Sequence, residues 1–227
     1  MSKKIRVAIL DDHRSIVDGY LYRLNGLSEI EVVATIAFGE ELEPTLAKYP
    51  TDVLLLDVSV PTGPANPNPY PILYIIPKLL QLHPGLNILV ISMHAERGMI
   101  TGVMEAGASG YILKDDQATI KDLGNVVLSV ASGGIYFSNK AHQLYAMPRT
   151  SEKDELLTDR QLEVLSLSAA YPDDTTAELA GKLSIAHSTV RNLLSGAYVR
   201  LGVHTRSAAI AKARQLGLIT PDSLLSS

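Results

Sequence analysis

Two apolar stretches in the first half of the chain end in carboxylates that could take part in chemistry. Residues 53–56 are followed by Asp57, and residues 5–10 are followed by Asp11 and Asp12. Apolar runs of this length are typical of strands buried on both faces of a parallel sheet. Ligands and reacting groups gather where such strands end. Asp57 is therefore the first candidate for a functional side chain.

Two further apolar stretches end at Ser92 and Lys114. If the carboxyl ends of all four strands share one edge of a sheet, the three carboxylates form a hard oxygen site suited to Mg²⁺, which compensates their charge. Lys114 adds a fixed positive charge. This set suits phosphoryl transfer to a carboxylate, with Asp57 attacking in line while the metal and Lys114 neutralise the oxygens of the transferred group. The Ser92 hydroxyl could hydrogen-bond the attached group.

These side chains can meet only if the surrounding elements form one sheet. Five predicted strands alternate with five predicted helices over roughly 130 residues, which indicates an α/β fold with a doubly wound, five-stranded parallel sheet of flavodoxin-like type. Pro77 should kink or delay the third helix, and Gly133 with Gly134 should end the fifth. The expected strands are 5–10, 30–36, 53–57, 87–92 and 108–113, and the expected helices are 13–25, 40–48, 74–82, 97–105 and 116–131.

Composition limits the possible classes of protein. A chain of 227 residues with 46% hydrophobic residues can bury a core in each of two domains. The formal net charge of −4 provides no global basic field, so nucleic-acid contact requires a local patch. The absence of cysteine excludes disulfides and thiolate metal sites. The amino terminus does not read as a signal peptide and no stretch reaches bilayer length, so we expect a cytoplasmic protein without a membrane partner.

The strand-end motifs resemble the receiver domain of two-component response regulators. They are Asp11-Asp12, the run 57–61 (Asp-Val-Ser-Val-Pro), the run 90–94 (Val-Ile-Ser-Met-His) and the run 107–114, which ends Tyr-Ile-Leu-Lys. The resemblance implies that Asp57 is the phosphoacceptor and that a sensor histidine kinase is the usual phosphoryl donor.

The same resemblance assigns roles to the neighbouring residues. Asp11, Asp12, Asp57 and the backbone carbonyl of Ser59 would bind the metal. Ser92 and Tyr111 would be the pair that moves inward after phosphorylation, although an aromatic residue at position 111 could also simply pack in the core. Taken singly, a strand-end Asp is more often a helix cap or a turn residue. It is the combination of complementary charges that favours a site.

The loop after Asp57 departs from the receiver pattern. Receivers usually continue from Pro61 through a short turn with an Asp-Gly pair, whereas residues 62–71 of this chain form a longer, proline-rich segment. Repeated prolines favour stiff, extended conformations. The segment is either a spacer or a lid or docking loop that controls access to Asp57.

The second half of the chain has a helical pattern. We divide the chain into a receiver domain (1–133), a linker (134–154) with a possible short helix at 142–147, and a helical domain (155–227). Thr158 with Gln161, and Thr175 with Glu178, have the capping-box spacing that fixes two helix starts.

A turn at 183–186 is typical of a helix-turn-helix pair. On the helix after it, one face is apolar and the opposite face could donate hydrogen bonds to bases and phosphates in a major groove, although it could also be an ordinary solvated face. A fourth helix at 207–216 would complete the domain. The predicted DNA-binding residues are Lys182, His187, Ser188, Thr189, Arg191, Asn192, Ser195 and Arg200.

Residues 157–165 and 200–206 (Arg-Leu-Gly-Val-His-Thr-Arg), with the helices between them, resemble the LuxR-type helix-turn-helix. The whole chain is thus similar to NarL-type response regulators, which implies a double-stranded DNA partner, a reading helix, and a last helix that pairs two monomers of an active homodimer. Several DNA-facing positions depart from the family pattern, namely Ala186, Ser188, Leu193 and Gly196. Residues 151–227 carry eight basic and nine acidic side chains, a net charge of −1, so few phosphate contacts are available.

The leading interpretation is a phosphorylation-controlled, DNA-binding transcriptional regulator with no enzymatic activity beyond its own phosphorylation and dephosphorylation. One alternative is a receiver-based adaptor with weak or lost DNA binding, and another is an atypical receiver controlled without phosphorylation. An enzyme or flavin-binding protein of similar topology is disfavoured because the chain has no Gly-rich phosphate loop of either nucleotide-binding pattern.

Overall fold

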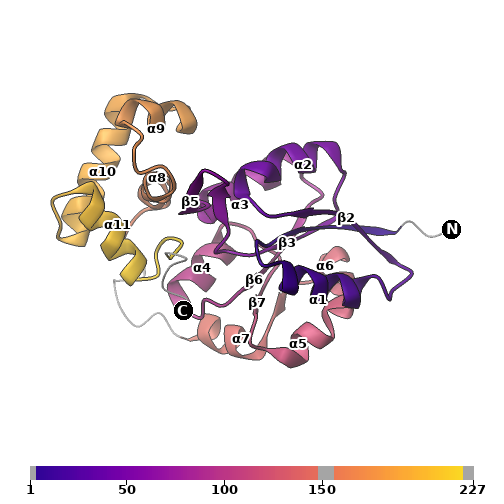
Figure 1. Ribbon diagram of the computed structural model, residues 1–227. Helices are drawn as coiled ribbons and strands as arrows, with labels where there is room; N and C mark the ends of the chain where they lie inside the picture. The colour runs from indigo at the N-terminus through magenta and orange to yellow at the C-terminus, as the bar shows by residue number, and fades with distance from the viewer. Residues whose placement is uncertain (1–3, 148–155, 222–227) are drawn as a thin grey trace.

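The computed structural model describes residues 4–147 and 156–221 as an α/β part and a helical part that lies against it (Figure 1). Residues 148–155, which hold most of the second half of the predicted linker and the first residue of the predicted helical domain, lie outside the described residues. Within the described ranges, no helix is long and apolar enough to cross a membrane.

The first part contains a parallel sheet with the strand order β2-β1-β3-β6-β7-β8. The parallel, doubly wound arrangement confirms the predicted fold class, but the predicted count of five strands is wrong, because the described sheet has six. The additional strand pairs with β7 through Tyr136 and Phe137, and a two-residue strand is too short to produce a sequence pattern. The strands are β1 (Ile5–Leu10), β2 (Ile30–Ile36), β3 (Val53–Leu56), β6 (Asn87–Ser92), β7 (Gly110–Leu113) and β8 (Tyr136–Phe137).

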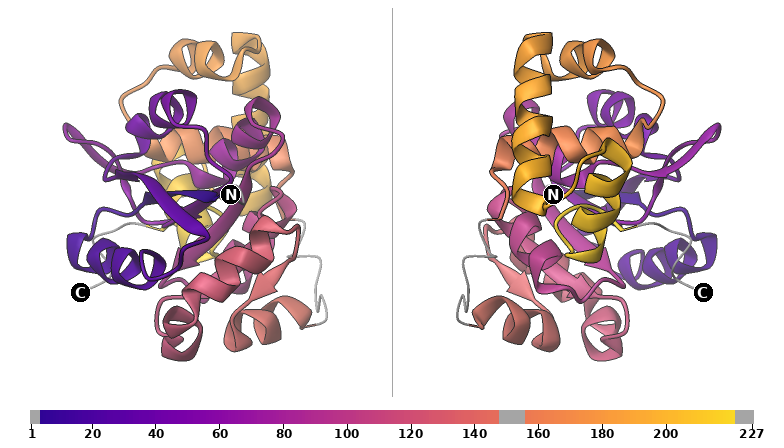
Figure 2. Two further views of the ribbon diagram at one scale, coloured as in Figure 1. Left: turned by 90° about the vertical axis from the view of Figure 1, so that its right-hand side faces the viewer. Right: turned by 90° about the vertical axis from the view of Figure 1, so that its left-hand side faces the viewer.

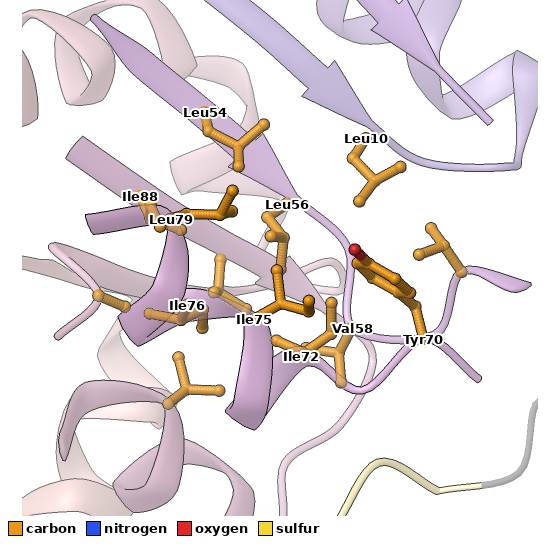
Figure 3. Packing of buried hydrophobic residues seen from close by; sticks show 14 of the residues in the cluster. Leu10, Leu54, Leu56, Val58, Tyr70, Ile72, Ile75, Ile76, Leu79 and Ile88 are labelled. Carbon is orange, nitrogen blue, oxygen red and sulfur yellow. The ribbon is translucent and has the colours of Figure 1, made fainter. Parts of the chain in front are cut away.

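Helices cover both faces of this sheet (Figure 2). The α1 and α6 helices bury apolar side chains against one face, while α2, α3 and α4 cover the other. Figure 3 shows side chains of β3 and α3 interdigitating in this second core. The helices are α1 (Arg14–Leu24), η1 (Gly39–Glu41, a 3₁₀ turn), α2 (Leu42–Lys48), α3 (Ile72–Leu82), α4 (Arg97–Glu105), α5 (Gln117–Lys121), α6 (Leu123–Ala131) and α7 (Asn139–Ala146).

Three details of the helix prediction change. The expected helix 116–131 is divided into α5 and α6 at Asp122, whose φ and ψ of −97° and 17° leave the helical region. The α3 helix begins at Ile72 and runs through Pro77, so the expected delay of this helix is wrong. Gly133 has a φ of 87° and ends α6 as expected. The short helix expected at 142–147 is present as α7 and begins earlier, at Asn139, whereas β8 was not expected among the residues that we assigned to the linker.

The proline-rich segment after Asp57 folds into an antiparallel hairpin of β4 (Pro61–Gly63) and β5 (Asn66–Pro69). The Thr62 hydroxyl donates a hydrogen bond to the carbonyl of Asn68 at 2.8 Å across the hairpin. At its base, the Tyr70 amide donates to the Val60 carbonyl at 2.9 Å. The buried Tyr70 ring lies beside Val58 (Figure 3) and covers Gly39 of η1. A segment that the sequence describes only as stiff and extended is therefore fixed to the receiver by its own base.

The helical part consists of α8 (Asp159–Ala170), α9 (Thr176–Leu183), α10 (His187–Leu201) and α11 (Arg206–Gln215) around a separate apolar core. Both predicted capping boxes are present, at Thr158 and at Thr175. Ser184 ends α9 in the left-handed conformation with a φ of 53°, which produces the sharp turn into α10. These features confirm the four-helix, helix-turn-helix prediction.

Gly39 is expected to be required for the packing of Tyr70 at the base of the hairpin. A Cβ atom at this position would overlap the buried ring of Tyr70, so Gly39→Ala should lower the free energy of unfolding of the α/β part by about 1–3 kcal/mol, as overpacked core substitutions do. Gly85→Ala is the matched control, because a Cβ there meets nothing within 4 Å. Urea unfolding followed by circular dichroism measures both variants, and equal midpoints would contradict the proposed packing.

Candidate functional site

The strand ends bring the predicted carboxylates together. Asp11, Asp12, His13 and Asp57 each offer a ligand atom, and these atoms all lie within 4.8 Å of one another. The sheet itself sets this arrangement, because the Asp57 amide donates to the Leu10 carbonyl at 2.8 Å and so extends the pairing of β1 with β3. Asp11 and Asp57 are each only 4% exposed.

Lys114 joins two of these carboxylates. Its Nζ lies 2.7 Å from Oδ2 of Asp11 and 2.8 Å from Oδ2 of Asp57, and its side chain is 7% exposed. The Lys114 amide donates to the Ser92 carbonyl at 2.8 Å, so the hydrogen-bonding ladder between β6 and β7 fixes the backbone from which the ammonium reaches across the sheet edge. Because Lys114 contacts both carboxylates, its charge stays compensated by Asp11 when Asp57 is neutral.

Burial and charge act in opposite directions on this pair. Burial raises the pKa of Asp57; the charge of Lys114 opposes this rise and the nearby Asp11 carboxylate adds to it. Burial alone would lower the pKa of Lys114, but the charges of Asp57 and Asp11 outweigh it, and the pKa lies above its ordinary value. Lys114 therefore stays protonated and supplies the fixed positive charge that the sequence predicted.

Ser92 and Tyr111 lie in the core beside the site. Ser92 is fully buried, and its hydroxyl accepts a hydrogen bond from the His94 amide at 3.1 Å. The Tyr111 hydroxyl donates to the His94 carbonyl at 2.7 Å, and burial raises the pKa of Tyr111 despite its hydrogen bond with Ser92. The predicted switch tyrosine thus occupies an inward position in this structure.

Two histidines belong to the site but had no role in the sequence prediction. The Nδ1 atom of His13 lies 2.9 Å from Oδ1 of Asp12, and its amide donates to Asp11 at 2.9 Å. The Nε2 atom of His94 is 2.8 Å from the Ser59 hydroxyl, which ties the loop after Asp57 to the loop after Ser92. Adjacency to Asp11-Asp12 was an available signal for His13, whereas the contact between residues 59 and 94 requires the fold.

The predicted DNA-facing side chains lie on the outer side of the helical part. All eight of them are exposed, and α10 faces the viewer in the right panel of Figure 2. Two of them have partners: the Nζ atom of Lys182 lies 3.9 Å from the centroid of the Tyr171 ring and 3.6 Å from the Asp174 carboxylate, and Nε2 of His187 contacts the Thr176 hydroxyl. The Ala186 N-cap makes no side-chain hydrogen bond, as expected from the departure noted in the sequence. Gly196 has a packing reason, because a Cβ there would lie 2.7 Å from Nε2 of Gln161.

Comparison with known families matches both parts of the chain. Residues 7–123 match the response regulator receiver domain, and residues 155–213 match the bacterial regulatory proteins of the luxR family. The chain belongs to the response regulator family. Its helix-turn-helix part is of the LuxR type, which confirms the NarL/LuxR resemblance.

Relatives of this response regulator match over nearly their whole length. The transcriptional regulatory protein DegU of Brevibacillus brevis is 30% identical, with 95% of both chains covered. The oxygen regulatory protein NreC of Staphylococcus aureus is 28% identical over 95% of this chain and 99% of that one. A structure of RcsB from Salmonella enterica serovar Typhimurium bound to promoter rprA in the presence of phosphomimetic BeF₃⁻ has a TM-score of 0.63 at 23% identity, with 92% and 98% of the chains covered. This last likeness extends the agreement in fold to both domains.

The buried charge of Asp57 should make the response regulator less stable as the pH rises. The pKa of Asp57 is raised in the folded state, so the folded protein binds this proton more tightly, and the resulting stabilisation is lost as the pH rises through the unfolded and then the folded pKa. Asp57→Asn should therefore raise the urea midpoint at pH 7 without divalent cations, and this gain should shrink towards pH 4. Asp18→Asn, at an exposed position of α1, is the control, and a gain that did not depend on pH would contradict this explanation.

Proposed function

We propose that this response regulator accepts a phosphoryl group on Asp57 and uses the modification to control DNA binding by its LuxR-type domain. The observation that carries the proposal is the buried Lys114 ammonium, which contacts both Asp57 and Asp11 at the edge of the sheet. In this reaction an Asp57 carboxylate oxygen forms a bond to phosphorus as the bond to the leaving group breaks, and a phosphohistidine of a sensor kinase is the proposed donor. Lys114 neutralises charge on the transferred group.

The residues around Asp57 fit a magnesium ion. Three carboxylates with clustered ligand atoms and the backbone carbonyl of Ser59 are the hard oxygen donors that Mg²⁺ prefers. We propose Asp11, Asp12, Asp57 and Ser59 as its ligands. When bound, the ion neutralises charge on the phosphoryl oxygens. The Asp11 carboxylate is held for this role by the amide of His13 and the ammonium of Lys114.

Ser92 and Tyr111 are the proposed switch residues. The Ser92 hydroxyl is placed in the core at the end of β6, and we propose that it turns to the phosphoryl group after transfer. Its present contact with the His94 amide would then be lost. Because the Tyr111 hydroxyl bonds the carbonyl of the same residue, a movement of the loop at residues 93–95 would change the hydrogen bonds of both Ser92 and Tyr111.

DNA binding is the proposed output, in the cytoplasm, with a homodimer as the active form. The exposed face of α10 presents Arg191, Asn192 and Ser195, side chains that can donate to phosphates and base edges. We propose α10 as the reading helix and α11 as the helix that pairs two monomers. The domain divisions 1–133 and 155–227 serve as the working boundaries of the two functions, although β8 and α7 pack with the first.

An adaptor function is the second candidate, and the charge of the helical domain favours it. Residues 151–227 have a net charge of −1, and Lys182 is held by Tyr171 and Asp174. A domain with few available cations binds DNA weakly outside its specific site.

Acetyl phosphate with Mg²⁺ should add one phosphoryl group to the purified protein, and Asp57→Asn should abolish the addition. Intact-mass spectrometry measures the product. The control Asp18→Asn should be phosphorylated to the same extent as the unsubstituted chain. Labelling that persisted in Asp57→Asn would refute the assignment of Asp57.

Arg191→Ala should weaken binding of the phosphorylated protein to a random DNA duplex at low salt and reduce the slope of log K against log salt by about 1. Arg160→Ala is the matched control, because Arg160 lies on α8 and pairs with Glu163 at 2.7 Å. Fluorescence anisotropy at several salt concentrations measures both. Absence of binding by the unsubstituted protein would favour the adaptor.

A further inference from the structure

The hairpin and the start of α3 contact the ends of two helices in the helical domain. The Asn66 side-chain amide donates to the Ala170 carbonyl at 2.9 Å, and the Tyr74 hydroxyl donates to the Lys182 carbonyl at 3.0 Å. Figure 1 shows β5 next to α8. Both acceptors lie in the last turn of their helices, α8 and α9, where carbonyls have no partner within the helix. The receiver therefore completes the C-terminal ends of two effector helices.

Hydrogen bonds within the hairpin itself orient Asn66 for this contact. Its Oδ1 atom accepts hydrogen bonds from the Asn68 amide at 3.2 Å and from the Asn68 side chain at 2.7 Å. These bonds fix which end of the Asn66 amide faces the hairpin and leave its Nδ2 atom directed at Ala170. A donor held in this way loses little conformational freedom on binding.

Apolar packing accompanies these hydrogen bonds. Tyr74 packs against the core of the α/β part and also against that of the helical part. Close to the hairpin, the buried Thr220 hydroxyl lies 3.5 Å from the carbonyl of Tyr70. Farther along the same interface there is a cavity of about 730 Å³, lined by Gly102 and Leu73 on one side and by Leu162 and Arg200 on the other. The two parts therefore approach each other more closely around the hairpin than over this cavity.

The hairpin is also the direct continuation of the phosphoacceptor loop. Its first strand begins at Pro61, and the intervening Val58 and Val60 are fully buried. Closely packed segments transmit displacements rather than absorb them. A short, buried piece of chain therefore connects Asp57 with β4, whose Gly63 pairs with Asn66 across the hairpin.

We propose that the β4–β5 hairpin, together with Tyr74, is a latch that holds the helical domain against the receiver, and that the chemical state of Asp57 determines whether the latch holds. The latch is the docking contact through Asn66 and Tyr74 to the ends of α8 and α9. The part that concerns Asp57 rests on the proposed function, whereas the docking contact does not. This gives the long loop after Asp57 the role of a docking element instead of a spacer.

The test measures the distance between the two domains in the full chain. Because the chain has no cysteine, Tyr22→Cys and Val199→Cys, at positions 85% and 80% exposed, provide two sites for spin labels in a background without other thiols. Electron paramagnetic resonance should give a narrow distance distribution for the unphosphorylated protein. Adding Asn66→Ala and Tyr74→Phe should broaden that distribution and shift it.

The matched control adds Asn125→Ala and Tyr49→Phe, which remove one amide and one hydroxyl from exposed positions of the receiver, and its distribution should stay narrow. A latch variant whose distribution is as narrow as that of this control overturns the proposal.

Acetyl phosphate with Mg²⁺ tests the dependence on Asp57 in the same labelled background, with intact mass reporting how much protein is phosphorylated. A phosphorylated sample should show the broad distribution of the latch variant. A phosphorylated sample that keeps the narrow distribution overturns the coupling to Asp57. Failure of phosphorylation refutes the proposed function instead, and the latch is then decided by the variants alone.

Discussion

The rest of the structure depends on an ammonium group buried between two carboxylates. Lys114 reaches from the end of β7 to Asp57 after β3 and Asp11 after β1, so one side chain joins three strands of the sheet. Removing these charges from water is costly unless they compensate one another, and they can do so only with the strands in their observed order. The sheet therefore places the Asp57 carboxylate next to the positive charge that compensates it.

The same constraint explains how the loop after Asp57 can transmit a displacement from the site to the hairpin. Asp57 is fixed by its backbone bond to Leu10 and its ion pair with Lys114, and the chain that follows is fully buried at Val58 and Val60. The hairpin beyond is therefore connected to a fixed point. Its prolines limit the unfolded alternatives of the segment, and Tyr70, seated over Gly39, anchors its base. A flexible loop of the same length would absorb a displacement of the site and would not pass it to the helical domain.

The sequence predicted those features that depend on local patterns. Strand-end charges located Asp11, Asp57 and Lys114, and the capping boxes at Thr158 and Thr175 located two helix starts that the structure confirms. The sixth strand was missed because two residues carry no periodicity. The contact of Ser59 with His94, and that of Asn66 with Ala170, join positions 35 and 104 residues apart, and no local pattern encodes such pairs.

The position of Tyr111 limits how a signal can leave the site. Its ring is already buried, and its hydroxyl is bonded to the His94 carbonyl, so an inward movement of this side chain is not available as the difference between two states that start from this arrangement. A two-state element needs a second arrangement that it can adopt at a small cost in free energy. The hairpin and Tyr74 can adopt a second arrangement, because each contributes one hydrogen bond to the helical domain, beside an apolar patch and a cavity. Besides the loop at residues 93–95, the direction open to a change at Asp57 is therefore forward along the chain, through Val58 and Val60 into β4.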